Sequence, residues 1–115
     1  MNEAREKALM AAVGAAIARE RVAAGKTQDQ VAEALGIGAE AVSRIERGLV
    51  MPSLVRLVDL AEVFGCPVER FVRRGSDRGA DQAAVIGEMI APLKKGDRQF
   101  VVEMVERVCG HLCGK

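Results

Sequence analysis

The sequence GIGAEAVSRIERG, residues 36–48, decides the fold. Its glycines frame a segment in which the apolar residues Val42 and Ile45 stand three positions apart. That spacing places both side chains on one face of a helix, and glycine is the residue that most often ends a helix. We therefore predict a short helix that starts at Gly38 and ends at Gly48.

The segment before it predicts a second helix with a complete start signal. Thr27 followed by Gln30 is the pattern of a capping box, in which each residue satisfies a backbone N–H of the other. Gly36 ends this helix. Its apolar residues recur at helical spacing: Val31, Ala32 and Leu35. A longer helix is predicted upstream over about residues 3–24, and Gly25 stops it.

Two further helices are predicted after Gly48. Ser53 is the N-cap of the first, and Gly65 closes it. Its apolar stripe contains Leu54, Leu57, Leu60, Ala61 and Phe64. Pro67 occupies the first position of a short fifth helix, where proline is favoured. In that helix we expect three residues to be buried: Val68, Phe71 and Val72.

The C-terminal third predicts a separate pair of helices. The charged, glycine-bearing run RRGSDRG at residues 73–79 is typical of a linker. The first helix then covers about residues 81–91 and is stopped by Pro92. The second begins with Asp97 as its N-cap and ends near residue 112. Its apolar stripe contains Phe100, Val101, Met104, Val105, Val108 and Leu112.

These patterns together predict an all-α protein, because no strand-like alternation occurs anywhere. We expect a five-helix domain over residues 1–74, a linker over 75–80 and a helical hairpin over 81–115. The second and third helices, joined by a glycine turn, form a helix-turn-helix. In that motif the first helix crosses the sugar-phosphate backbone of DNA and the second enters the major groove. Ala32 suits the point where the two helices cross closely.

The run KTQDQVAEALGIGAEAVSRIERGLVMPSLVRLVDLAEVFG, residues 26–65, resembles the phage-repressor/Cro-like (XRE-type) helix-turn-helix family. The resemblance rests on T-Q, A-x-x-L-G, V-S-R-I-E-R-G and P-S-L-x-x-L-x-x-L-A, and it covers about residues 10–73. It implies a repressor-like fold for the five-helix domain and a role in regulating transcription.

The resemblance also implies which residues face double-stranded DNA. The eight positions are Thr27, Gln28, Gly38, Ala39, Glu40, Ser43, Arg44 and Arg47. Among them, Gln28 contacts a phosphate and braces the recognition helix, and Arg47 lies near the backbone. Arg21 and Glu46 match a structural ion pair of the family, between the first and third helices.

The reading face departs from the family pattern. Gly38 replaces the usual serine or threonine, while Ala39 and Ala41 offer only methyl groups. Glu40 can accept a hydrogen bond from cytosine, but it repels phosphates. Arg44 is the one strong donor, and a bidentate contact with guanine is worth about 1–3 kcal/mol of discrimination. The alternative for Arg44 is a surface ion pair with Glu40, four positions away.

Composition excludes several function classes. Net charge is +1, with 11 Lys/Arg and 10 Asp/Glu up to Gly75 and 6 of each after it, which argues against a nonspecific polycationic binder. Tryptophan and tyrosine are absent, which disfavours the stacking platforms that hold single strands. No apolar run could cross a bilayer, and Glu3 and Glu6 spoil the basic start of a signal peptide.

The three cysteines form an odd set without a disulfide-scaffold spacing, so we expect a reducing, cytoplasmic location. Cys109, His111 and Cys113 raise a metal-site hypothesis. On one helix, however, His111 points roughly 200° away from Cys109, so the three cannot converge. We expect no metal and no cofactor, with a redox-sensing thiol pair as the alternative. No catalytic constellation stands out, and we expect no enzyme.

The predicted function is a dimeric transcriptional repressor. One recognition helix with one strong base contact gives little specificity, whereas two helices about 34 Å apart on a twofold axis read a palindrome. We place the dimer contact on the last helix, at Val101, Met104, Val105, Val108 and Leu112. The alternative is that the last two helices pack back on the first and fifth in a monomer.

The rival function is a protein-binding module, such as an antitoxin-like or anti-repressor partner. Three features motivate it: the near-zero net charge, the methyl groups of Ala39 and Ala41, and the apolar loop 49–51.

Overall fold

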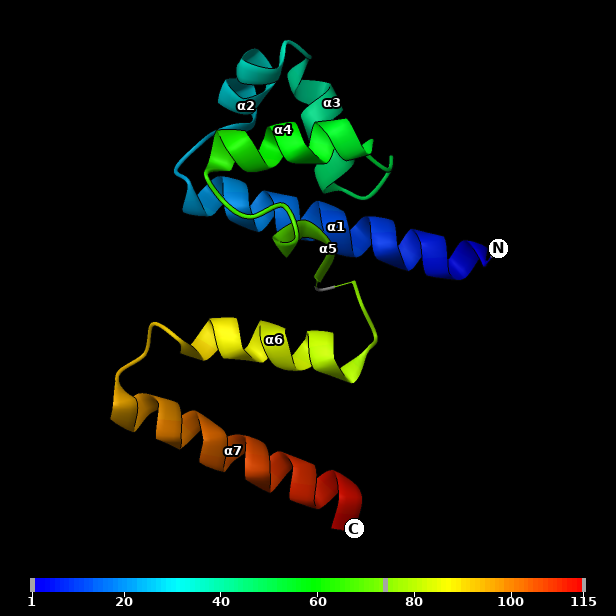
Figure 1. Ribbon diagram of the computed structural model, residues 1–115. Helices are drawn as coiled ribbons and strands as arrows, with labels where there is room; N and C mark the ends of the chain where they lie inside the picture. Colours follow the sequence, from blue (N-terminus) through cyan, green and yellow to red (C-terminus); the bar gives the residue numbers. More distant parts are fainter. Residues whose placement is uncertain (1, 74, 115) are drawn as a thin grey trace.

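The computed structural model describes residues 2–73 and 75–114, and within these ranges all regular structure is helical. Figure 1 shows the helices in chain order. Their bounds are α1 (Glu3–Ala23), α2 (Gln28–Leu35), α3 (Ala39–Glu46), α4 (Leu54–Phe64), α5 (Arg70–Arg73), α6 (Gly79–Ile90) and α7 (Lys95–Gly114). The expectation of an all-α protein is therefore confirmed.

The core lies among α1–α5, where α1 contacts α3, α4 and α5, and α2 contacts α3 and α4. Phe71 of α5 and Ile17 of α1 are both fully buried, and the ring of Phe71 meets that of Phe64 edge to face. The remaining fully buried large side chains are Val13, Val31, Val42 and Leu60. Val42 and Ile45 thus point inward from α3, which fixes the outward face of this helix.

Helix α3 crosses α1 at very short range because both contact points are glycines. A Cβ added to Gly14 of α1 would lie 2.4 Å from the carbonyl oxygen of Ile45. Gly48, which follows α3 with φ +75°, lies against the backbone of Ala11 in the same way. The C-terminal end of α3 therefore packs directly against the backbone of α1.

Helices α6 and α7 lie apart from this core. In Figure 1 they lie beyond α5, with α7 on the far side of α6 from the other helices. Within the described chain, the main contact of α6 with the preceding helices is with α5, and α7 has no comparable contact. Neither helix buries a single residue.

Four local predictions are wrong. Pro67 does not occupy the first position of α5, because a turn closed by the Arg70 N–H and the Pro67 carbonyl oxygen precedes the helix, which begins at Arg70. Leu54 is 74% exposed because it lies on the outer side of the first turn of α4, while Leu57, Leu60 and Ala61 enter the core. Val72 is exposed because α5 is only four residues long and turns Phe71 inward instead. Asp97 lies in the first turn of α7 rather than at its N-cap, because the helix begins at Lys95.

Candidate nucleic-acid interface

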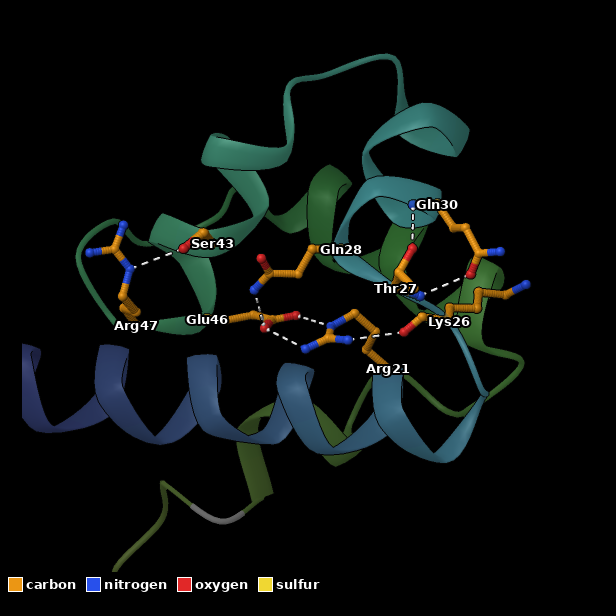
Figure 2. A network of polar contacts seen from close by, with 8 residues as sticks. All are labelled: Arg21, Lys26, Thr27, Gln28, Gln30, Ser43, Glu46 and Arg47. Atoms are coloured by element: carbon orange, nitrogen blue, oxygen red, sulfur yellow. Dashed lines mark hydrogen bonds and ion pairs between the residues drawn. The ribbon is translucent and has the colours of Figure 1, made fainter.

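The start of α2 is held by the predicted capping box. The hydroxyl oxygen of Thr27 accepts from the backbone N–H of Gln30 at 3.0 Å, and the Gln30 side chain accepts from the backbone N–H of Thr27 at 2.9 Å. This closed pair fixes the first turn of α2, from which Gln28 projects (Figure 2). The hydroxyl proton of Thr27 remains available to an acceptor outside the chain.

A polar network joins α1, α2 and α3 next to that turn (Figure 2). Arg21 donates to Glu46 through Nε at 2.6 Å and through Nη2 at 3.1 Å, and through Nη1 to the carbonyl oxygen of Lys26 at 2.9 Å. Gln28 Nε2 donates to Glu46 Oε1 at 2.9 Å. Gln28 therefore braces the end of α3 through the same carboxylate that Arg21 holds.

The network is largely removed from solvent, since the side chains of Arg21 and Glu46 are 17% and 6% exposed. The hydrogen bonds that Arg21 donates to Glu46 raise the pKa of its guanidinium, against the opposing effect of burial. Glu46 thus accepts three hydrogen bonds, which offset part of the cost of burying its carboxylate.

The outward face of α3 carries a second, exposed pair. Arg47 donates through Nη2 to Glu40 at 3.0 Å and through Nε to the hydroxyl of Ser43 at 3.0 Å. Their spacing places all three side chains on one face of the helix. Arg47, which the resemblance places near the DNA backbone, is thus held along the outward face of α3 by Glu40 and Ser43.

Arg44 is exposed on the same side of α3, and no hydrogen bond or ion pair ties its side chain to another described residue. Glu40, which the sequence offered as an alternative ion-pair partner for Arg44, pairs with Arg47 instead. Gly38 is exposed and caps α3 without a side-chain hydrogen bond, and Ala39 turns its methyl group partly against the core. Among the side chains of this face, Arg44 is the donor that a base edge can meet without first breaking an ion pair.

Beyond α3 the surface is apolar. Leu49 and Met51 in the α3–α4 loop are 55% and 46% exposed, and Leu54 and Val55 continue this surface onto α4. The loop therefore adds no positive charge to the face that α2 and α3 present.

The residues expected at a dimer contact all lie on α7. Met104, Val105, Val108 and Leu112 are exposed, and Val101 is half-buried against α6. An apolar groove between the two helices is lined by Ile86, Ile90, Val101, Val102, Val105 and Cys109. Helix α7 thus shows one flank to α6 and leaves the other to solvent.

The cysteines lie in two different settings. Cys109 and Cys113 are exposed on α7, while Cys66 is half-buried beside Glu20. Burial, together with the nearby Glu20 carboxylate, raises the pKa of the Cys66 thiol. In the described part of the chain, no group of three or more potential ligands is arranged to hold a metal ion. None of the described helices is long and apolar enough to cross a bilayer.

Comparisons with known proteins agree with this geometry. A family model described as "Helix-turn-helix" matches residues 17–71. Among solved structures, the clp gene regulator ClgR from Corynebacterium glutamicum superimposes with a TM-score of 0.56 at 26% sequence identity. The alignment covers 72% of this chain and 86% of that one. No curated protein matches the sequence.

Proposed function

We propose that the protein is a sequence-specific repressor of transcription in the cytoplasm, in which residues 17–71, the segment matched by the helix-turn-helix family model, act as an XRE-type DNA-binding domain. A DNA-binding transcription regulator is what the family model and the likeness to a gene regulator support. The finer proposal is that two copies bind a palindromic operator, each inserting α3 into the major groove.

The observation that carries the proposal is the state of Arg44. Its guanidinium is exposed and unpaired within the described chain, on the outward face of a helix fixed from behind by Val42, Ile45 and Glu46. A preset helix with a free bidentate donor is the arrangement that reads guanine in the major groove. Glu40, Ser43 and Arg47 modify this contact, and Gln28 and Thr27 anchor the phosphates.

Arg44→Ala tests the assignment. Selection of bound duplexes from a random pool defines the operator for the natural sequence, and titrations then compare the variant on that operator. We expect Arg44→Ala to lose about 10- to 100-fold in affinity and to become indifferent to the base at one guanine position per half-site.

Two controls sharpen this experiment. Arg5→Ala removes an exposed arginine from the start of α1 and should leave affinity unchanged. Gln28→Ala should weaken binding to all duplexes similarly, because a phosphate contact carries no sequence information. Equal loss at every base position in Arg44→Ala would contradict base reading by Arg44.

A second candidate function is supported by the apolar surface of the α3–α4 loop. Leu49, Met51, Leu54 and Val55 form an exposed apolar patch where a DNA-facing loop would gain from positive charge. A protein-binding module would use this patch and need no duplex. Failure to select any duplex sequence would favour this function over DNA reading.

A further inference from the structure

The joint between the helix-turn-helix domain and α6 is held mainly by polar contacts. A cleft of about 220 Å³ separates α1, α5 and α6, so apolar side chains do not fill this junction. Val85 and Met89 of α6 and Ala16 of α1 line the cleft. Close packing, which fixes the angle between most neighbouring helices, is therefore weak here.

One contact that crosses this gap is an ion pair between Arg73 of α5 and Glu88 of α6. The two side chains are 27% and 43% exposed, so solvent screens the pair only in part. Arg73 lies two residues after Phe71, whose ring is fully buried, so the cation is fixed to the core of the domain. Glu88 lies on the third turn of α6.

A second contact holds the beginning of α6. The hydroxyl of Ser76 donates to Asp81 at 2.6 Å, which ties the first turn of α6 to the preceding segment. The Ser76 contact fixes where α6 starts, and the Arg73–Glu88 pair, further along the helix, fixes its direction. Loss of the second contact would therefore weaken the control of the direction of α6 more than that of its starting point.

We infer that Arg73 and Glu88 are positioning residues that set the distance between the two recognition helices, and with it the spacing of the half-sites. This rests on the proposed dimer, in which α7 carries the twofold axis. Every contact between α7 and the DNA-binding domain then passes through α6 and this joint. The molecule is 51 Å along its longest axis, so a small rotation at the joint moves α3 by about the 3.4 Å rise of one base pair.

The DNA test compares duplexes in which the two selected half-sites are moved one or two base pairs nearer or farther. The natural sequence should prefer one spacing. Glu88→Gln should keep its affinity for an isolated half-site but reduce the spacing preference by about threefold, as expected for the loss of a partly screened ion pair. Exchanging the charges in Arg73→Glu/Glu88→Arg should restore the preference.

Glu103→Gln is the matched control, because Glu103 lies on α7 and, among the described residues, its side chain is hydrogen-bonded to Gln99 one turn away and not to the joint. It should leave both the half-site affinity and the spacing preference unchanged. A Glu88→Gln variant that behaves like this control would overturn the inference, as would a natural sequence with no spacing preference.

A second measurement needs neither DNA nor a dimer. Trypsin cleavage after Arg73, whose side chain is 27% exposed while it is paired with Glu88, reports how often the joint opens. Glu88→Gln should be cut several-fold faster than the natural sequence or Glu103→Gln, at an unchanged unfolding temperature. If Glu88→Gln is cut faster but no duplex sequence is selected, the DNA-binding function is contradicted while the role of the Arg73–Glu88 pair at the joint stands. Unchanged cleavage of Glu88→Gln would show that the Arg73–Glu88 pair does not hold α6 against the domain.

Discussion

At the scale of single residues, Glu40 is the least expected feature of the reading face. A carboxylate that approaches DNA repels phosphates, and in this protein it also holds Arg47 along α3. Glu40→Gln removes the repelling charge and frees Arg47 at once. We expect tighter binding to all duplexes, by about three- to tenfold at low salt, with a weaker preference at the base that Glu40 faces.

The check is a salt titration of binding to the selected operator and to an unrelated duplex. The variant should show a steeper salt dependence than the natural sequence, because Arg47 can then neutralise a phosphate. Ser43→Ala, which removes only the second acceptor of Arg47, should show a smaller change in the same direction. An unchanged salt slope in Glu40→Gln would show that Arg47 never reaches the backbone.

Arg21 has the opposite role, in stability rather than in recognition. The side chain of Glu46 is 6% exposed. In Arg21→Ala its carboxylate would keep, among the described residues, the single hydrogen bond from Gln28. Breaking a buried pair from one side costs about 3–5 kcal/mol in free energy of unfolding. Urea denaturation followed by circular dichroism measures the loss.

The double variant Arg21→Met/Glu46→Leu should lose less than Arg21→Ala, because it leaves no buried charge behind. A single variant as stable as the natural protein would contradict the burial of this pair.

Side-chain pairings were only partly predictable from the sequence. Arg21 and Glu46 stand 25 positions apart, and their pairing followed from resemblance rather than from any local pattern. The sequence offered an ion pair between Glu40 and Arg44 as an alternative, whereas Glu40 pairs with Arg47, because local spacing leaves two arginines within reach of one carboxylate. Which of them pairs depends on side-chain packing that a single sequence does not specify.

At the scale of helices, the starts and ends were largely predictable, since the signals are chemical and local. Thr27 and Ser53 accept the expected capping hydrogen bonds, and Gly36 and Gly65 adopt the left-handed conformation after α2 and α4. The side of a helix that is buried was less predictable at its ends. Leu54 and Val72 lie in terminal turns, where the neighbouring helix no longer covers them.

No sequence pattern identified Gly14 as important, although the close packing of α3 on α1 depends on it. A methyl group at this position would lie 2.4 Å and 2.7 Å from two carbonyl oxygens of α3, and a backbone cannot yield as a flexible side chain does. We expect Gly14→Ala to lower the free energy of unfolding by about 1–3 kcal/mol.

Gly87→Ala is the matched control, because Gly87 also lies within a helix but its added Cβ would meet nothing within 4 Å. It should raise stability by about 0.5–1 kcal/mol through better helix propensity. Thermal unfolding of both variants measures the two shifts. Equal shifts would mean that α1 and α3 do not approach as closely as described.

At the scale of the whole molecule, α7 carries an apolar surface that no other described helix covers. Phe100, Met104, Val108 and Leu112 recur at four-residue intervals and are 42–70% exposed. This flank lies apart from the one that lines the groove with α6. A second copy that covers it would bury this surface without disturbing the α6–α7 pair.

Val108→Glu tests this arrangement in the full chain. A charge in the middle of the face should shift the protein from dimer to monomer in sedimentation and weaken operator binding by more than tenfold. Gln99→Glu adds the same charge nine positions away, on the opposite side of the helix, and should change neither. A dimeric Val108→Glu would place the contact elsewhere.

The polar network behind α3 has a consequence for redesign. The buried core and the shared carboxylate of Glu46 hold this helix from its inner side, while Glu40, Ser43 and Arg44 contribute nothing to the core. The residues that hold this eight-residue helix in place therefore differ from those to which we assign DNA recognition. A combinatorial library at positions 40, 43 and 44 should therefore stay folded throughout and yield regulators with new operators.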